Sequence, residues 1–272
     1  METEGINQND GLRDFAKKSF DFLDIRKDLY IAGNGPAVIV MTEMPGISPQ
    51  VARFARWIRD AGFTVYMPSL FGQDGVVVSA QEGAAVFQKT CVSAEFRALG
   101  NKGERPITLW LRALARHAHA ACGGPGIGTI GMCFTGNFAL AMMLEPVTLA
   151  PVLAQPSLPL DNPAALDSSA EELDQIRHRL EQEDLTVLAY RFEGDPICRA
   201  ERFTAYSKAL GERFQAKEIP DSAANTDVAP FFKRHVPFPH SVVTQHLVDA
   251  VGHPTLAARD EIIAFLKKRL ME

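Results

Sequence analysis

Residues 37–67 read AVIVMTEMPGISPQVARFARWIRDAGFTVYM. The first six residues form an almost unbroken apolar run, which is typical of a strand buried on both faces. A loop rich in breakers follows, and residues 49–60 then carry apolar side chains at helical spacing. These side chains are Val51, Phe54, Ala55 and Ile58. Gly62 ends that helix and residues 63–67 begin a second strand, so the stretch predicts a strand–helix–strand unit.

The same alternation of short apolar runs and longer helical patterns continues along the chain. Further strands are predicted at 127–132, 148–154 and 185–192, and further helices at 107–121 and 138–144. Two later helices are marked by Phe203, Tyr206, Leu210 and Phe214, and by Ile263, Leu266 and Leu270. Such alternation is typical of the α/β class, with a mostly parallel sheet flanked by helices. No low-complexity linker divides the chain, so we expect one domain over residues 1–272.

One polar segment interrupts this alternation. Residues 156–183 contain three prolines and then become helical and charged. We expect an excursion or a lid here, and not a domain boundary. Ser168 or Ser169 would cap its helix, ahead of Glu171 and Glu172.

Composition excludes several classes of protein. The chain is 46% hydrophobic and 22% charged, which is ordinary for a globular protein, and its net charge of −5 offers no basic surface for nucleic acid. No apolar run approaches the length of a membrane span, and no secretory signal begins the chain. The four cysteines, Cys91, Cys122, Cys133 and Cys198, form no metal-binding or disulfide pattern. We expect a cytoplasmic protein, a monomer or a homodimer, without a nucleic-acid or membrane partner.

The stretch 131–136, GMCFTG, follows a predicted strand and opens a predicted helix. In α/β-hydrolases the nucleophile occupies such a turn in the pattern G-x-S-x-G, because strand and helix approach closely there. Gly131 fills the first small position, Cys133 the nucleophile position, and Thr135 the second small position, with Gly136 one residue later. A buried structural cysteine in a tight turn would produce a similar pattern.

A cysteine nucleophile requires a base and an acid that orients the base. Asp195 lies in FEGDP, directly after the strand predicted at 185–192, although this sequence also suits a plain turn. Four histidines follow it, at positions 235, 240, 246 and 253. His240 ends a short apolar run and His253 directly precedes the last helix, so chain position alone leaves these two in competition.

Together these motifs resemble the dienelactone hydrolase family, a group of α/β-hydrolases with a cysteine nucleophile. The resemblance extends over about residues 24 to 270 and rests on the order and spacing of the motifs. GMCFTG is similar to the family's G-x-C-x-G-G, FEGDP supplies the acid Asp195, and His240-Ser241-Val242 matches the family's histidine segment. The family also has a glutamate beside the thiol, and Glu43 matches it. The resemblance therefore favours His240 over His253.

The resemblance implies a hydrolase that cleaves a small ester or lactone without a metal or an organic cofactor. Cys133, His240 and Asp195 would form the triad and pass through a thioacyl-enzyme, with Glu43 beside the thiol. The backbone N–H groups of Phe134 and Met44 would form the oxyanion hole.

Two positions depart from the family pattern. Thr135 replaces a glycine, and Thr244 stands where the family has an arginine that binds an anionic lactone. These departures also suit a catalytically silent relic that binds a small ligand or a partner. A redox thiol protein, pairing Cys133 with Cys198 or Cys91, is a further alternative.

Overall fold

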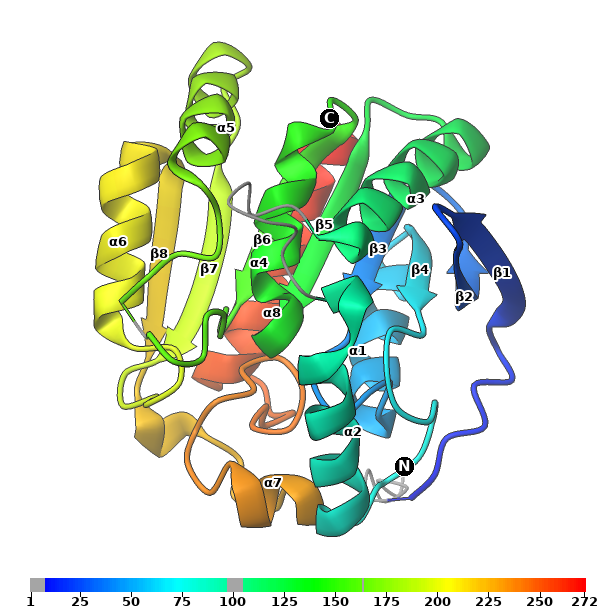
Figure 1. Ribbon diagram of the computed structural model, residues 1–272, viewed down its shortest axis with the longest axis vertical. Coiled ribbons are helices and arrows are strands. Elements are labelled where there is room, and N and C mark those ends of the chain that lie inside the picture. The colour runs from blue at the N-terminus through cyan, green and yellow to red at the C-terminus, as the bar shows by residue number, and fades with distance from the viewer. Residues whose placement is uncertain (1–7, 97–104, 163) are drawn as a thin grey trace.

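The computed structural model describes residues 8–96, 105–162 and 164–272. The eight strands in this part of the chain form one sheet, in the order β1-β2-β4-β3-β5-β6-β7-β8 (Figure 1). The strands are β1 (Ala16–Phe22), β2 (Ile25–Gly33), β3 (Ala37–Met41), β4 (Thr64–Pro68), β5 (Ile127–Met132), β6 (Thr148–Ala154), β7 (Val187–Phe192) and β8 (Phe214–Ile219). The α-helices are α1 (Pro49–Asp60), α2 (Ala80–Val92), α3 (Pro106–Cys122), α4 (Gly136–Ala141), α5 (Ala170–Gln182), α6 (Ala200–Leu210), α7 (Pro230–His235) and α8 (Pro254–Leu270).

The predicted α/β class is confirmed by the pairing of the strands. From β4 to β8 all neighbours are parallel, while β1 and β2 form an antiparallel hairpin at one edge, and β2 pairs antiparallel with β4. The helix predicted at 49–60 has those bounds, and its four apolar side chains are all buried. Register is fixed here because both sheet faces carry apolar side chains that must stay covered.

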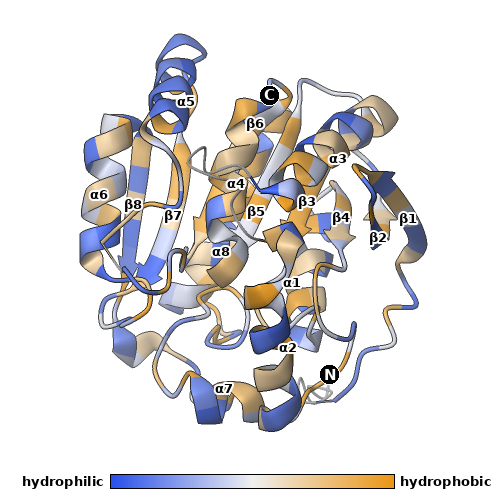
Figure 2. Cartoon of the chain, in the orientation of Figure 1, coloured by the Kyte–Doolittle hydropathy of each residue, from blue (hydrophilic) through white to orange (hydrophobic). Residues whose placement is uncertain are grey.

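Helices cover both faces of the sheet. Side chains of α1 and α8 pack into the apolar layer on one face, and side chains of α3, α4, α5 and α6 pack on the other. Figure 2 shows hydrophobic residues concentrated on the central strands, while α5 is largely hydrophilic. The ends of the central strands are therefore held in place by two packed layers.

Three details differ from the sequence prediction. Phe214 is not the last member of a helical stripe: α6 ends at Leu210, Gly211 adopts a φ of +63°, and Phe214 begins β8. The helix predicted at 138–144 begins earlier, at Gly136, and changes to a 3-10 turn over Met142–Leu144. The hairpin of β1 and β2 was not predicted from the sequence, because its residues are mostly half-buried or exposed and lack a long apolar run.

The polar segment that begins at residue 156 is tied to the body of the molecule. The Ser169 hydroxyl caps α5, as predicted, and accepts from the Glu172 N–H at 3.1 Å. The buried guanidinium of Arg202 donates to the carbonyls of Pro156 and Pro159 at 2.9 and 2.6 Å, and Arg105 donates twice to Asp167. The described part of this segment is thus anchored to helices on one face of the sheet.

Helix α2 and the short helix α7 lie beyond the carboxyl ends of the strands (Figure 1). They pack closely: a Cβ built on Gly83 of α2 would lie 2.2 Å from the ring of Phe231 on α7. Phe231, Phe232 and Val236 belong to a small apolar cluster separate from the two layers on the sheet. This pair of helices therefore covers the edge at which parallel strands of α/β proteins build their sites.

Candidate active site

Cys133 lies at the carboxyl end of β5, where the chain turns sharply into a 3-10 turn (Cys133–Thr135) and then α4. Its φ is +53°, a left-handed conformation that costs roughly 1–3 kcal/mol in a residue other than glycine. The side chain is half-buried. A strained strand-to-helix turn of this kind presents a nucleophile at the end of the sheet.

Two glycines make this turn possible. A Cβ on Gly131 would lie 2.2 Å from the carbonyl oxygen of Thr135, and one on Gly136 would lie 2.6 Å from Cα of Pro156. The second small residue is thus required three positions after Cys133, not two. At the intervening position Thr135 is fully buried, and its hydroxyl lies 3.2 and 3.1 Å from the carbonyls of Met41 and Thr42.

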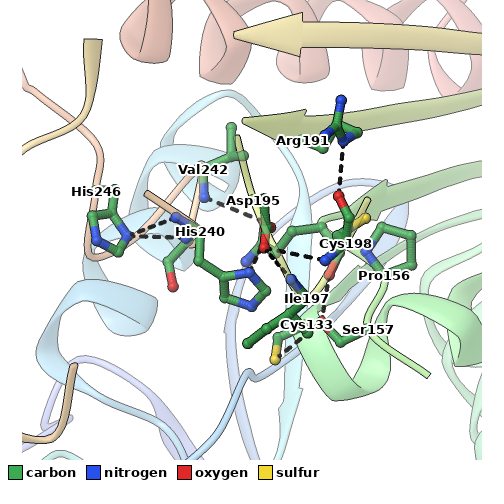
Figure 3. Close-up of polar contacts among 12 residues, drawn as sticks. Cys133, Pro156, Ser157, Arg191, Asp195, Ile197, Cys198, His240, Val242 and His246 are labelled. Atoms are coloured by element: carbon green, nitrogen blue, oxygen red, sulfur yellow. Dashed lines mark hydrogen bonds and ion pairs between the residues drawn. The ribbon is translucent and has the colours of Figure 1, made fainter. Parts of the chain in front are cut away.

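Asp195 lies in the loop after β7 and holds His240. Its Oδ2 is 2.6 Å from Nδ1 of His240, and its Oδ1 accepts from the backbone N–H groups of Ile197 and Cys198 at 2.9 and 3.1 Å (Figure 3). Burial alone would raise the pKa of Asp195. The charge of His240 and these hydrogen bonds outweigh burial and hold the pKa below its ordinary value. An ionised carboxylate is therefore available to fix the imidazole.

The His240 ring lies between Asp195 and Cys133 (Figure 3). Burial favours the neutral ring, but the charge of Asp195 and the neighbouring sulfur of Cys133 raise the pKa of His240 well above its ordinary value. Within the part of the chain that the structure describes, Nε2 of His240 is buried without a partner at standard hydrogen-bond distance. That nitrogen is thus left for Cys133 or for a substrate atom.

Ser157 also contacts the thiol. Its hydroxyl lies 3.4 Å from Sγ of Cys133 and 2.9 Å from the carbonyl of Gln155, and its backbone N–H donates to the carbonyl of Cys133 at 3.0 Å. A hydroxyl has one proton, so Ser157 donates either to the sulfur or to Gln155 at a given moment. In the sequence, the one feature that points to Ser157 is its position shortly after the strand predicted at 148–154.

Glu43 follows β3 and is almost completely buried. Its carboxylate accepts from Ser241 Oγ at 2.6 Å, from Gln155 Nε2 at 3.2 Å and from the Thr244 hydroxyl. Burial raises the pKa of Glu43, although these three donors and the charge of His240 counter it. The hydrogen bonds of Glu43 in the described structure therefore go to Ser241 and Thr244, in the segment that carries His240, and to Gln155. They do not go to the Cys133 thiol, which the family resemblance places beside Glu43.

His246 supports the segment that carries His240. Its Nδ1 accepts from the backbone N–H groups of His240 and Ser241 at 3.3 and 3.0 Å (Figure 3). Burial and the charge of His240 lower its pKa to about 4, so the ring is neutral and able to accept at neutral pH. His253, the alternative to His240 as the base, has another role. Its side chain caps α8 and accepts from the Thr255 N–H.

A sequence model of the dienelactone hydrolase family matches residues 28–217. The chain belongs to the dienelactone hydrolase family. Membership confirms the predicted resemblance and the predicted enzyme class, a hydrolase acting on ester bonds. No curated protein is similar enough in sequence to match the chain.

Solved structures share the α/β-hydrolase fold, as predicted. A dienelactone hydrolase-like promiscuous phosphotriesterase from metagenomic libraries is 19% identical, covers 92% of this chain and 97% of its own, and superposes with a TM-score of 0.60. An esterase from Pyrococcus furiosus is 11% identical, covers 94% and 93%, and has a TM-score of 0.57. An α/β serine hydrolase without a lid from Xanthomonas campestris is 13% identical, covers 96% and 97%, and has a TM-score of 0.54.

The two positions that depart from the dienelactone hydrolase pattern both have internal partners. Thr135 ties the turn of Cys133 to the end of β3, as described above. Thr244 is fully buried and its hydroxyl donates to Glu43, so it does not reach a ligand. The two positions predicted for the oxyanion hole lie on different segments. Met44 follows β3, and Phe134 is the second residue of the 3-10 turn that carries Cys133, where N–H groups have no partner within the helix.

A cavity of about 380 Å³ adjoins Cys133 and His240, within the usual size range of small-molecule sites.

Over residues 8–96, 105–162 and 164–272, no cluster of three or more His, Cys, Asp or Glu side chains could hold a metal ion. None of the helices in these ranges is long and apolar enough to span a bilayer. The four cysteines are free thiols, with Cys91 exposed on α2 and Cys198 buried.

Proposed function

We propose that this dienelactone hydrolase family member cleaves a small carboxylic ester or lactone through a Cys133–His240–Asp195 triad and a thioacyl-enzyme. The observation that supports the proposal is the chain of side chains from Asp195 through His240 to Cys133, with Cys133 on a strained turn at the end of β5. The three residues lie in the order nucleophile, acid, histidine that α/β-hydrolases use.

In the first half-reaction the sulfur of Cys133 attacks the ester carbonyl carbon, and Nε2 of His240 receives the thiol proton. A tetrahedral intermediate forms with its negative charge on the former carbonyl oxygen. The ester C–O bond then breaks, and His240 gives its proton to the leaving alcohol. Asp195 accepts a hydrogen bond from Nδ1 throughout, which fixes the tautomer and stabilises the imidazolium.

The backbone N–H groups of Phe134 and Met44 would donate to the oxyanion of that intermediate. Loss of one such donor typically costs about 3–4 kcal/mol of transition-state stabilisation. In the second half-reaction His240 removes a proton from water, the resulting hydroxide attacks the thioester, and the C–S bond breaks. The acid leaves and Cys133 recovers its proton from His240.

Glu43 acts in this proposal as a positioning residue. Its carboxylate is bound to Ser241 and Thr244, which belong to the segment that carries His240, and to Gln155 at the end of β6. It also directly precedes Met44. Glu43 therefore fixes His240 relative to the loop proposed to supply one oxyanion donor.

The proposal is tested with p-nitrophenyl acetate, a small lactone and a dienelactone, using wild type, Cys133→Ala and Cys91→Ala. Cys91 is the matched control because it is an exposed free thiol on α2. We expect wild type and Cys91→Ala to turn over at least one substrate, and Cys133→Ala to lose activity by about 10⁴-fold or more. Mass spectrometry of the quenched wild type should find an acyl group on Cys133.

Two results would overturn the proposal. Equal turnover by wild type and Cys133→Ala would remove Cys133 as the nucleophile. Absence of turnover together with absence of an acyl adduct would favour the alternative of a relic that binds a small ligand or a partner. Peroxide-driven pairing of Cys133 with Cys198 or Cys91 would instead support the redox alternative.

A further inference from the structure

The cavity beside Cys133 is lined by helices α2 and α7, which lie at the carboxyl edge of the sheet. Ala84 and Phe87 of α2 line it on one side, and Phe231 and Phe232 of α7 on another. Leu160, from the segment anchored by Arg202, and Ile197, from the loop of Asp195, complete its apolar lining. Most of the lining around the thiol is thus built from aromatic and aliphatic side chains.

The described lining contains no arginine or lysine, and the charge of His240 is already paired with Asp195. Apart from Cys133 and His240, the polar residues that line the cavity in the described ranges are Gln88 and His235, both with exposed side chains. Nε2 of His235 lies 3.1 Å from the carbonyl of Ala80. A carboxylate carried into the described part of this cavity would therefore lose its hydration without gaining an unpaired cation.

Thr244 does not supply a polar contact to a charged ligand in place of the arginine. Its side chain is fully buried, and its hydroxyl is bound to Glu43 behind His240. A polar contact from this position to a ligand would require the Thr244–Glu43 hydrogen bond to break. Of the described segment that carries His240, only His240 itself therefore lines the cavity.

We propose that the site selects uncharged esters whose apolar group of several carbons fills the cavity between α2 and α7, and that it discriminates against esters carrying a carboxylate on that group. This inference rests on the proposed function, and it adds the substrate class. Leu160, Phe87 and Phe231 would be the residues that determine specificity, because they form the wall in contact with the apolar group.

The test compares two esters that differ at one end. p-Nitrophenyl hexanoate and the mono-p-nitrophenyl ester of adipic acid have the same six-carbon chain, with a terminal methyl in one and a carboxylate in the other. From acetate through butyrate to hexanoate, we expect kcat/KM to rise about threefold to fourfold for each methylene that the cavity buries. The adipic acid ester should be roughly tenfold or more slower than the hexanoate, because its carboxylate is desolvated without a partner.

A charge placed on the lining should change this preference. Gln88→Arg puts a guanidinium at the cavity, and Gln81→Arg puts the same charge on an exposed position of α2 outside the lining. We expect Gln88→Arg to raise the ratio of adipic acid ester to hexanoate turnover by about fivefold, and Gln81→Arg to leave it within twofold. A ratio of two substrates does not depend on how much of each variant folds.

The outcomes separate this inference from the proposed function. Turnover that depends on Cys133 but prefers the adipic acid ester, or falls steadily from acetate to hexanoate, would overturn the substrate class and leave the triad intact. An equal response to Gln88→Arg and Gln81→Arg would also overturn it. No turnover of any ester, acetate included, would overturn the proposed function and this inference together.

Discussion

The turn that carries Cys133 and the loop that carries His240 are held in different ways. We call residues 131–136 the thiol turn and residues 239–247 the histidine loop. The thiol turn depends on close backbone approach: glycines at 131 and 136 leave no room for a Cβ. The histidine loop depends on side-chain hydrogen bonds from distant segments, which reach it from Glu43, Gln155, Asp195 and Asn225.

The difference explains why a short sequence motif predicts the thiol turn but no such motif predicts the contacts of the histidine loop. A steric requirement at a turn limits residue types over a few adjacent positions. A hydrogen-bond network limits residues at many separate positions and tolerates several combinations of donor and acceptor. The four predictions that follow test these two modes of support, in order of decreasing expected effect.

Asp195→Asn should have the largest effect, because it removes the charge that orients His240. An amide that donates to Nδ1 would favour the wrong tautomer, and we expect kcat for a p-nitrophenyl ester to fall by about 10³–10⁴-fold. Glu193→Gln is the matched control, since Glu193 is an exposed acid in the same loop. Steady-state kinetics at neutral pH would check this, and a loss below tenfold would place the orienting acid elsewhere.

Gly131→Ala tests the thiol turn. Its Cβ would lie 2.2 Å from a backbone oxygen, so the turn must shift, and we expect the free energy of unfolding to fall by about 3 kcal/mol. Gly11→Ala is the control, because its nearest neighbours are side-chain atoms of Arg13 at 3.4 Å or more. Urea unfolding of both variants would check this, and equal stability would show that the turn has room to relax.

His246 makes the histidine loop sensitive to acid. Its pKa of about 4 in the folded chain lies below the ordinary value of 6.5, so the unfolded state binds more protons between these values. Stability should therefore be fully present above pH 6.5 and fall as pH decreases, by about 2 kcal/mol at pH 5.

His246→Asn should remove this contribution, because the amide oxygen can accept a hydrogen bond but does not titrate. Unfolding of wild type and variant at pH 5.0 and pH 7.5 would check this. A wild type and variant that lose the same stability between the two pH values would show that His246 is not the titrating group. The His246→Leu variant, without an acceptor, should also lower kcat because the backbone of His240 loses a partner.

Glu43→Gln should have the smallest effect. The amide replaces one acceptor oxygen with a donor, so one of the bonds to Ser241 or Thr244 must rearrange, and we expect a loss of about 1 kcal/mol in stability. Iodoacetamide labelling of Cys133 should change by less than about threefold, since the carboxylate does not hydrogen-bond the sulfur. A tenfold change in labelling would instead place Glu43 beside the thiol, as the family resemblance implies.

The sequence alone determined the α/β class and most of its elements, because buried strands and amphipathic helices need repeated apolar spacing that a sequence displays directly. It also supplied Cys133 and Asp195 as candidates for the proposed triad, since each follows a recognisable strand, and through the family resemblance it favoured His240 as the base. Only the tertiary structure decided what surrounds them. Ser157, Gln155 and His246 support the site from loops whose proximity follows from strand order, and strand order depends on the packing of the whole chain.

Thr135 and Thr244 show the same division. In the sequence both are departures from a family pattern, and in the structure both are buried hydroxyls with internal partners. A threonine hydroxyl is small and both donates and accepts, so its role depends on which atoms the fold brings within 3 Å of it. Residue type and spacing determined the chemistry available to this chain, and three-dimensional packing decided which groups use it.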